Sequence, residues 1–234
     1  MLFTTPISLL LALAPTTIFA APTQTFDALA QLVPRKAQTS ASQCDLSNAV
    51  LPTAPTPLPA VGAGLTLRHV AIGRGTQNYT CASASATTVP VAVGAVASLF
   101  NATCDTVNSP AVVAGVTKIA LLYSVPSSAL AESRLSGHHE FTDKKVPLFK
   151  LETDRVNYGY VQAIPDVVKS SAPANSEKGS NGQGSVPWLK LNAVEGDYKE
   201  VYRVNTAGGM APKTCEGISG GFTVDYAAQY WFYA

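Results

Sequence analysis

The residues that could carry chemistry in this sequence are first of all its three histidines, at positions 69, 138 and 139. Neighbouring side chains on a β-strand point to opposite faces, so His138 and His139 are poorly placed to bind one metal ion together. His69 lies in an alternating apolar segment, which favours a hydrogen-bonded histidine in the core. A metal site that combines His69 with one of the pair stays open as an alternative.

Arg203 is the most specific of the charged residues. It lies inside a strand-like segment, between an aromatic and an aliphatic residue. An arginine on a half-buried strand needs an anionic or carbonyl partner, because an unpaired buried cation is costly. Glu195, Asp197 and Glu200 lie just upstream. We interpret these carboxylates as a solvated turn rather than as the carboxylate pair of a glycosidase.

The glycine-rich segments do not form a dinucleotide site. Such a site needs the pattern G-x-G-x-x-G between a strand and a helix. The G-x-G sequences that begin at Gly62 and Gly73 both lack the third glycine. A dinucleotide-dependent enzyme is therefore disfavoured, and no cofactor is predicted.

The elements that must position these residues are mostly β-strands. Short segments rich in valine, leucine, phenylalanine and tyrosine are bounded by turn residues. The expected strands span residues 65–72, 91–100, 116–125, 146–151, 156–163, 186–194, 198–205 and 222–233. Residues 127–135 offer only a helical turn or two, and residues 169–185 form a low-complexity surface loop. Many short strands without intervening helices predict a mainly β fold, an antiparallel sandwich or barrel.

The last expected strand indicates which of its faces is buried. Alternate residues of a strand point to opposite sides. One face carries Phe222, Val224, Tyr226, Ala228, Tyr230 and Phe232. The other face carries Thr223, Asp225, Ala227, Gln229, Trp231 and Tyr233. We expect the first face to join the core and the second to form a polar-aromatic surface.

The first 20 residues have the pattern of a secretory signal peptide. Residues 1–26 contain no charged side chain, and a short apolar run at 7–14 precedes a small residue, Ala20, at the expected cleavage position. The apolar run is too short to span a membrane, and no later stretch is long enough either. The sequence therefore predicts export without a membrane span.

An N-terminal arm is expected over residues 21–60. Apolar residues at helical spacing between Phe26 and Val33 predict a short helix. The four prolines within residues 50–59 predict an extended chain. The β domain then occupies residues 61–234.

Cysteines and glycosylation sequons also indicate export. Four cysteines, Cys44, Cys81, Cys104 and Cys215, follow the leader. An even number favours two disulfides with three possible connectivities, and zinc binding is disfavoured because the sequence has no C-x-x-C pair. Asn78 and Asn101 each begin an N-glycosylation sequon. Together these features predict a secreted, extracellular glycoprotein.

The charge balance excludes one class of partner. Charged residues make up 13% of the chain, and 16 basic residues against 15 acidic ones leave a net charge of +1. A nucleic-acid-binding protein would show a basic excess that neutralises phosphates. No nucleic-acid partner is therefore expected.

Four segments taken together resemble a known family. They are residues 69–81 (HVAIGRGTQNYTC), 186–191 (VPWLKL), 202–212 (YRVNTAGGMAP) and 226–233 (YAAQYWFY). Their order resembles the secreted family known as domain of unknown function 3455, in its fungal form. Some members carry a malate dehydrogenase label. The missing dinucleotide motif disfavours this activity for the present sequence.

The resemblance implies a disulfide pairing and a preferred histidine. It implies that Cys81 pairs with Cys215, which leaves Cys44 to pair with Cys104. It also makes His139 a better candidate than His138 for a functional role.

Two classes of function remain after these observations. The first is a non-catalytic binding or cell-surface module with a polar-aromatic pocket, which would hold a small molecule or a component of the cell wall or extracellular space. We expect this pocket to contain Gln77, Tyr79, His139, Trp188 and Arg203. The alternative is a secreted hydrolase or metal-dependent enzyme that uses His69 or His139 with a carboxylate.

Overall fold

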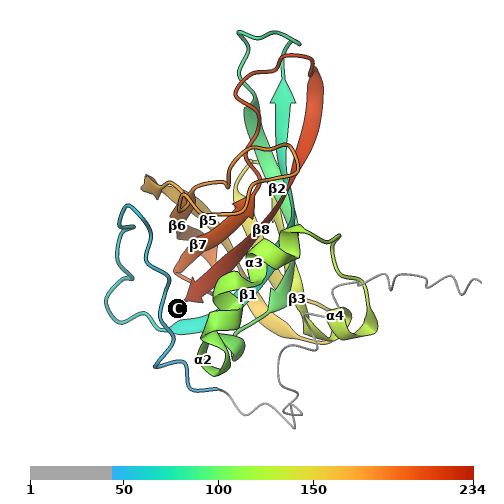
Figure 1. The fold of residues 1–234 in the computed structure, drawn as a ribbon. Helices are drawn as coiled ribbons and strands as arrows, with labels where there is room; N and C mark the ends of the chain where they lie inside the picture. The colour runs from blue at the N-terminus through green and yellow to red at the C-terminus, as the bar shows by residue number, and fades with distance from the viewer. Residues whose placement is uncertain (1–43) are drawn as a thin grey trace, which may run out of the picture.

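The computed structural model describes residues 44–234, which fold into a closed barrel of eight antiparallel β-strands (Figure 1). The strands are β1 (Leu67–Cys81), β2 (Val91–Asn101), β3 (Leu135–Phe141), β4 (Pro147–Glu152), β5 (Asn157–Ser170), β6 (Trp188–Gly196), β7 (Glu200–Gly208) and β8 (Gly220–Tyr233). The helices between β2 and β3 are α2 (Asp105–Asn108), α3 (Pro110–Leu121) and α4 (Ala129–Arg134). The predicted mainly β, antiparallel fold is confirmed, and its form is a barrel.

Each strand pairs with its neighbours in sequence, and β1 closes the barrel by pairing with β8. The β1–β8 ladder runs from Leu67 opposite Tyr233 to Cys81 opposite Gly220. Parts of β1, β2 and β8 extend beyond the other strands and form a tip (Figure 1). Because the ring of strands is closed, side chains on all the inner faces share one interior.

The inner face of β8 is the one that the alternation predicts. Tyr226, Ala228, Tyr230 and Phe232 are buried in the interior of the barrel with residues of the other strands. The opposite face is not the polar-aromatic surface that we expected, since its C-terminal half is buried too. The residues buried there are Ala227, Gln229, Trp231 and Tyr233. This expectation was wrong because helix α3 and the arm cover the outside of the barrel at β8.

The proline-rich part of the arm packs on the outside of the barrel. We call the buried residues beneath it the outer cluster: Val70, Trp188, Tyr202, Val204, Trp231 and Tyr233. Apolar side chains of the arm, including Leu51, Ala54 and Leu58, contact this cluster. The Tyr202 hydroxyl also donates a hydrogen bond to the carbonyl of Pro59, at 2.8 Å. The segment that composition predicts as an extended arm therefore supplies part of the hydrophobic core.

A buried ion pair lies beneath the end of the arm. Lys190 Nζ is 2.6 Å from Glu200 Oε1, and both side chains are nearly inaccessible, at 7% and 11% exposure. The end of the arm and the residues that follow it close over this pair, because the Ala60 carbonyl accepts from Lys190 Nζ and the Gly62 amide donates to Glu200 Oε2. The interpretation of Glu200 as part of a solvated turn was therefore wrong.

Helix α3 replaces a strand that the sequence led us to expect at residues 116–125. Its valines and isoleucine favour a strand locally, but Pro110 at the first turn suits a helix start. Val113, Thr117 and Ala120 then fall on one buried face of the helix. The short helix expected within residues 127–135 is present as α4.

Two disulfides fasten the fold. Cys44 pairs with Cys104, and Cys81 pairs with Cys215. This is the connectivity that the family resemblance implies. The first disulfide joins the arm to the segment after β2, and the second joins the end of β1 to the loop before β8. Both therefore link parts of the chain that lie far apart in sequence.

Two N-terminal predictions fall outside the described residues. They are the signal peptide over residues 1–20 and the helix between Phe26 and Val33. Within residues 44–234, no helix combines the length and the apolar character that a bilayer-spanning segment needs.

Candidate functional site

The structure brings four of the five predicted pocket residues to the inner wall of the barrel. Gln77 and Tyr79 lie two residues apart on the same face of β1. His139 on β3 packs against the interior rings of Phe149 and Tyr230. Arg203 on β7 alternates with two residues of the outer cluster and so points inward. We call the group formed by Gln77, Tyr79, His139, Arg203, Tyr226 and Tyr230 the interior cluster.

Trp188 does not belong to the interior cluster. Its neighbour Leu189 points into the barrel, so the alternation of β6 directs Trp188 outward. It packs in the outer cluster beneath the arm, and its indole Nε1 has no hydrogen-bond partner among residues 44–234. Its assignment to the pocket is therefore not supported by its position.

Two tyrosines of β8 complete the interior cluster. The hydroxyls of Tyr226 and Tyr230 lie 2.9 Å apart and form a hydrogen bond. Gly73 makes room for this arrangement, because a Cβ atom at that position would lie 2.7 Å from Cε2 of Tyr230. Burial raises the pKa of both tyrosines, while the nearby Arg203 charge acts in the opposite direction. Both hydroxyls are therefore neutral at pH 7.

His139 is a neutral imidazole with a defined tautomer. Its Nδ1 lies 2.9 Å from the carbonyl oxygen of Leu148, which can only accept, so Nδ1 carries the proton and Nε2 a lone pair. Its ring stacks on Phe149 at a centroid distance of 4.2 Å. Burial lowers the pKa of His139 to about 4; the hydrogen bond to Leu148 opposes this shift, and the Arg203 charge adds to it.

Arg203 supplies the positive charge of the interior cluster. Its Nη2 and Nε donate to the carbonyl of Pro187 at 3.0 and 3.3 Å, and a carbonyl is one of the two kinds of partner that the sequence predicts for it. In the part of the chain that the structure describes, no carboxylate lies within ion-pair distance of this guanidinium. The charge acts instead on neutral neighbours, since it favours the ionised forms of Tyr79, Tyr226 and Tyr230.

Gln77 carries a buried donor that lacks a hydrogen bond of good geometry. Its side chain is 9% exposed and Nε2 makes no hydrogen bond among the described residues, although the amide is close enough to the Tyr226 hydroxyl to act toward a lower pKa of that tyrosine. It lies next to Tyr226, since a Cβ atom on Gly209 would touch both Gln77 and Tyr226. Tyr79 has a partner, because its hydroxyl donates to the Gly209 carbonyl at 2.7 Å. An unpaired buried donor costs on the order of 1–3 kcal/mol. A ligand whose acceptor atom binds Gln77 Nε2 would recover this free energy.

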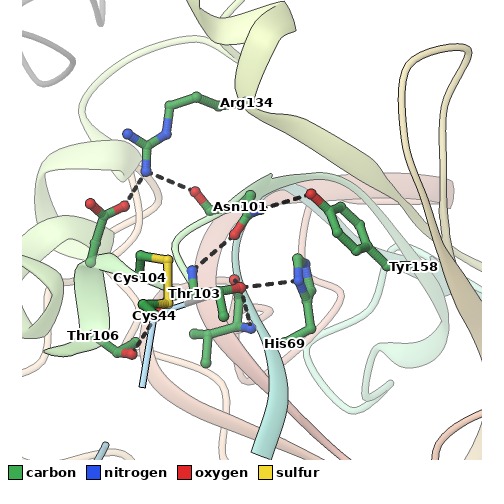
Figure 2. A network of polar contacts seen from close by, with 10 residues as sticks. Cys44, His69, Asn101, Thr103, Cys104, Thr106, Arg134 and Tyr158 are labelled. Atoms are coloured by element: carbon green, nitrogen blue, oxygen red, sulfur yellow. Dashed lines mark hydrogen bonds and ion pairs between the residues drawn. A yellow bond between two sulfur atoms is a disulfide. The ribbon is translucent and has the colours of Figure 1, made fainter. Parts of the chain in front are cut away.

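His69 lies in a separate polar site inside the barrel (Figure 2). Ser136 Oγ donates to the Leu99 carbonyl and therefore accepts from His69 Nε2, at 3.2 Å. The Thr103 hydroxyl lies 3.0 Å from Nδ1, and the ring stacks on Tyr158 at 4.7 Å. Burial lowers the pKa of His69 to about 4. Both ring nitrogens are thus paired, as expected of a core histidine.

The two buried histidines do not converge on one site. The rings of Phe232 and Phe149 lie between them, with centroid distances of 5.8 Å from His69 to Phe232, 5.5 Å from Phe232 to Phe149 and 4.2 Å from Phe149 to His139. His138 points outward, as the alternation predicts, and is exposed. Within residues 44–234, no three His, Cys, Asp or Glu side chains lie close enough together to hold a metal ion.

A serine in a G-x-S-x-G sequence was missed in the sequence analysis. Ser219 has glycines at the matching positions, but it is exposed in the turn that leads into β8. A nucleophile elbow instead places its serine between a strand and a helix. Ser219 therefore gives little support to a hydrolase.

The two sequon asparagines differ in how their side-chain amides are used. Asn101 Nδ2 donates to the Tyr158 hydroxyl, and its Oδ1 accepts from the Thr103 amide (Figure 2). Asn78 Oδ1 accepts from the Thr76 hydroxyl. The Asn78 Nδ2 has no hydrogen bond to any residue in the range 44–234.

Comparison with known proteins gives one match. The family model described as "Protein of unknown function (DUF3455)" matches residues 62–234, a range that includes all eight strands. No curated protein and no solved structure matches the sequence significantly.

Proposed function

The chain belongs to the family of proteins of unknown function DUF3455, and for this member we propose the binding of one small organic ligand inside the barrel. The observation that carries the proposal is the Nε2 donor of Gln77, which is buried beside Tyr226 without a hydrogen bond, in the interior cluster that also contains Arg203 and His139. An eight-stranded barrel has an interior that is either filled by side chains or holds one small ligand. A few polar groups on an otherwise apolar wall are typical of sites that fix the orientation of a ligand.

The interior cluster is better suited to holding a ligand than to moving protons. Its histidine has a pKa of about 4 and is a weak base at neutral pH. Neither His69 nor His139 has a carboxylate partner among residues 44–234. The cluster does offer a cation, an amide donor and the lone pair of a neutral imidazole. These groups can recognise different atoms of one molecule.

Replacement of Gln77 tests the proposal. Saturation-transfer NMR of the secreted protein with a panel of small organic acids, amides, alcohols and sugars identifies ligands, and a titration gives their affinity. Gln77→Leu is expected to weaken binding about tenfold, the loss of one hydrogen bond to a charged or strongly polar group. The same change removes an unpaired donor, so the thermal midpoint should stay the same or rise.

Gln162→Leu is the matched control, because Gln162 lies on the outside of the barrel and pairs with Glu195. It should leave ligand affinity unchanged. The proposal fails if no compound in the panel binds, or if Gln77→Leu binds every ligand as tightly as the wild type does.

The proposed site of action is outside the cell. The charge-free leader and the two disulfides support export, because disulfides persist in oxidising compartments. Expression of the full chain in a secreting eukaryotic host is expected to release protein that begins at Ala21. Enzymatic deglycosylation should lower its mass, and Asn78→Gln should abolish part of that shift, since the Asn78 amide nitrogen is not engaged by the fold. Retention in the cell with residues 1–20 intact would contradict export.

A further inference from the structure

We propose that the ligand is a small carboxylate with an aromatic or other planar apolar body, and that Arg203 is its counter-charge. This inference rests on the proposed binding function and names the chemical class of the ligand. It also gives Arg203 a role beyond its hydrogen bonds to the Pro187 carbonyl.

The charge of the interior cluster favours an anion. Arg203 is half-buried and has no carboxylate within ion-pair distance among residues 44–234. The groups around it, which include His139, Tyr226 and Tyr230, are neutral at pH 7. A cation with only neutral neighbours and a low-dielectric wall gains most from an anionic partner.

The donors that remain on Arg203 fit a carboxylate. The contact with the Pro187 carbonyl uses Nε and one Nη2 hydrogen, and the guanidinium also interacts with the Tyr230 hydroxyl, which leaves the other Nη donors for a ligand. A guanidinium binds a carboxylate through two parallel N–H groups. Gln77 lies on β1, on the other side of β8, and its Nε2 is a separate donor of the interior cluster beside Tyr226. Arg203 alone can therefore supply the donors for the oxygens of one carboxylate.

The wall next to these donors suits an apolar body. In the register of the barrel, Ala95 lies opposite Gln77, and Ala97 lies opposite both Gly75 and His139. These short side chains lie between the polar groups of β1 and β3. The ring of Phe149, stacked on His139, adds an aromatic surface. A ligand that has its charge at one end and a planar apolar body at the other matches this distribution.

The test compares carboxylates with their neutral amides. Benzoate, phenylacetate, benzamide and phenylacetamide are titrated at pH 7 into the secreted wild-type protein, with chemical shifts or heat as the readout. The carboxylates are expected to bind at least about tenfold more tightly than the amides, as a charge-assisted pair requires. Arg203→Gln should remove this preference. Arg203→Lys keeps the charge but lacks the paired N–H groups of the guanidinium, so it should retain part of the preference.

Arg155→Gln is the control, because Arg155 is exposed in the connection between β4 and β5. It should keep the full preference, and the thermal midpoint of each variant shows whether it is folded. Equal affinity of amides and carboxylates would overturn the carboxylate assignment and leave the binding function in place. Binding of only uncharged compounds from the wider panel would do the same, whereas no binding at all would overturn both proposals.

Discussion

Acidification from pH 6.5 to pH 4 is expected to reduce the free energy of unfolding by about 3 kcal/mol for each of the two buried histidines, His69 and His139. Burial lowers the pKa of each from 6.5 to about 4 in the folded protein. Between these values the unfolded chain binds protons that the folded protein does not, so stability falls as the pH falls. Above pH 6.5 the histidines are neutral in both states, and the loss is absent.

Urea denaturation at pH 7 and at pH 4.5 measures this effect. His139→Asn keeps an N–H that can donate to the Leu148 carbonyl but does not titrate, so its stability should depend less on pH than that of the wild type. The exposed neighbour His138 provides the control, and His138→Asn should keep the wild-type pH dependence. A His139→Asn variant with the wild-type pH dependence would show that His139 is protonated in the folded protein.

The second large effect is expected at the ion pair beneath the arm. Glu200→Gln keeps the shape of the side chain but leaves the buried Lys190 ammonium without its counter-charge, which lies 2.6 Å away in the wild type. Removal of one partner of a buried pair costs about 3–5 kcal/mol. The free energy of unfolding, measured by urea denaturation at pH 7, should fall by that amount.

Two further variants separate charge from packing. The double variant Lys190→Met with Glu200→Gln removes both charges and should recover most of the loss. Glu152→Gln breaks an exposed pair in which Lys150 Nζ and Glu152 Oε2 are 3.9 Å apart, and it should cost no more than about 1 kcal/mol. Equal losses for Glu200→Gln and Glu152→Gln would mean that the arm does not shield the pair from water.

The fold and the inner wall of the barrel could be predicted to the extent that side chains alternate clearly. On β8 the alternation identifies Tyr226 and Tyr230 as inward residues, and the structure places both inside. Alternation alone assigns both tyrosines to the core and does not indicate that their hydroxyls belong to the interior cluster. The available signal was that each buried hydroxyl needs a hydrogen-bond partner.

The alternation was uninformative where a strand is covered on both faces. Trp188 and Leu189 are adjacent and both apolar, so hydrophobicity alone does not show which of them points inward. The local sequence was also misleading at residues 116–125, where β-branched residues lie on a helix packed against the barrel. In both places contacts between distant parts of the chain contribute to the structure, and at α3 the local signal for a helix is Pro110 at its first turn.

The position of the arm has a spectroscopic consequence. The chain contains two tryptophans, and both Trp188 and Trp231 belong to the outer cluster beneath the arm. Indole fluorescence shifts to longer wavelength when the ring meets water, so the emission of this protein depends on whether the arm stays docked. The proposed ligand site lies on the other face of the same strands and contains no indole. Tryptophan emission is therefore an optical reporter of arm docking that is separate from the ligand site.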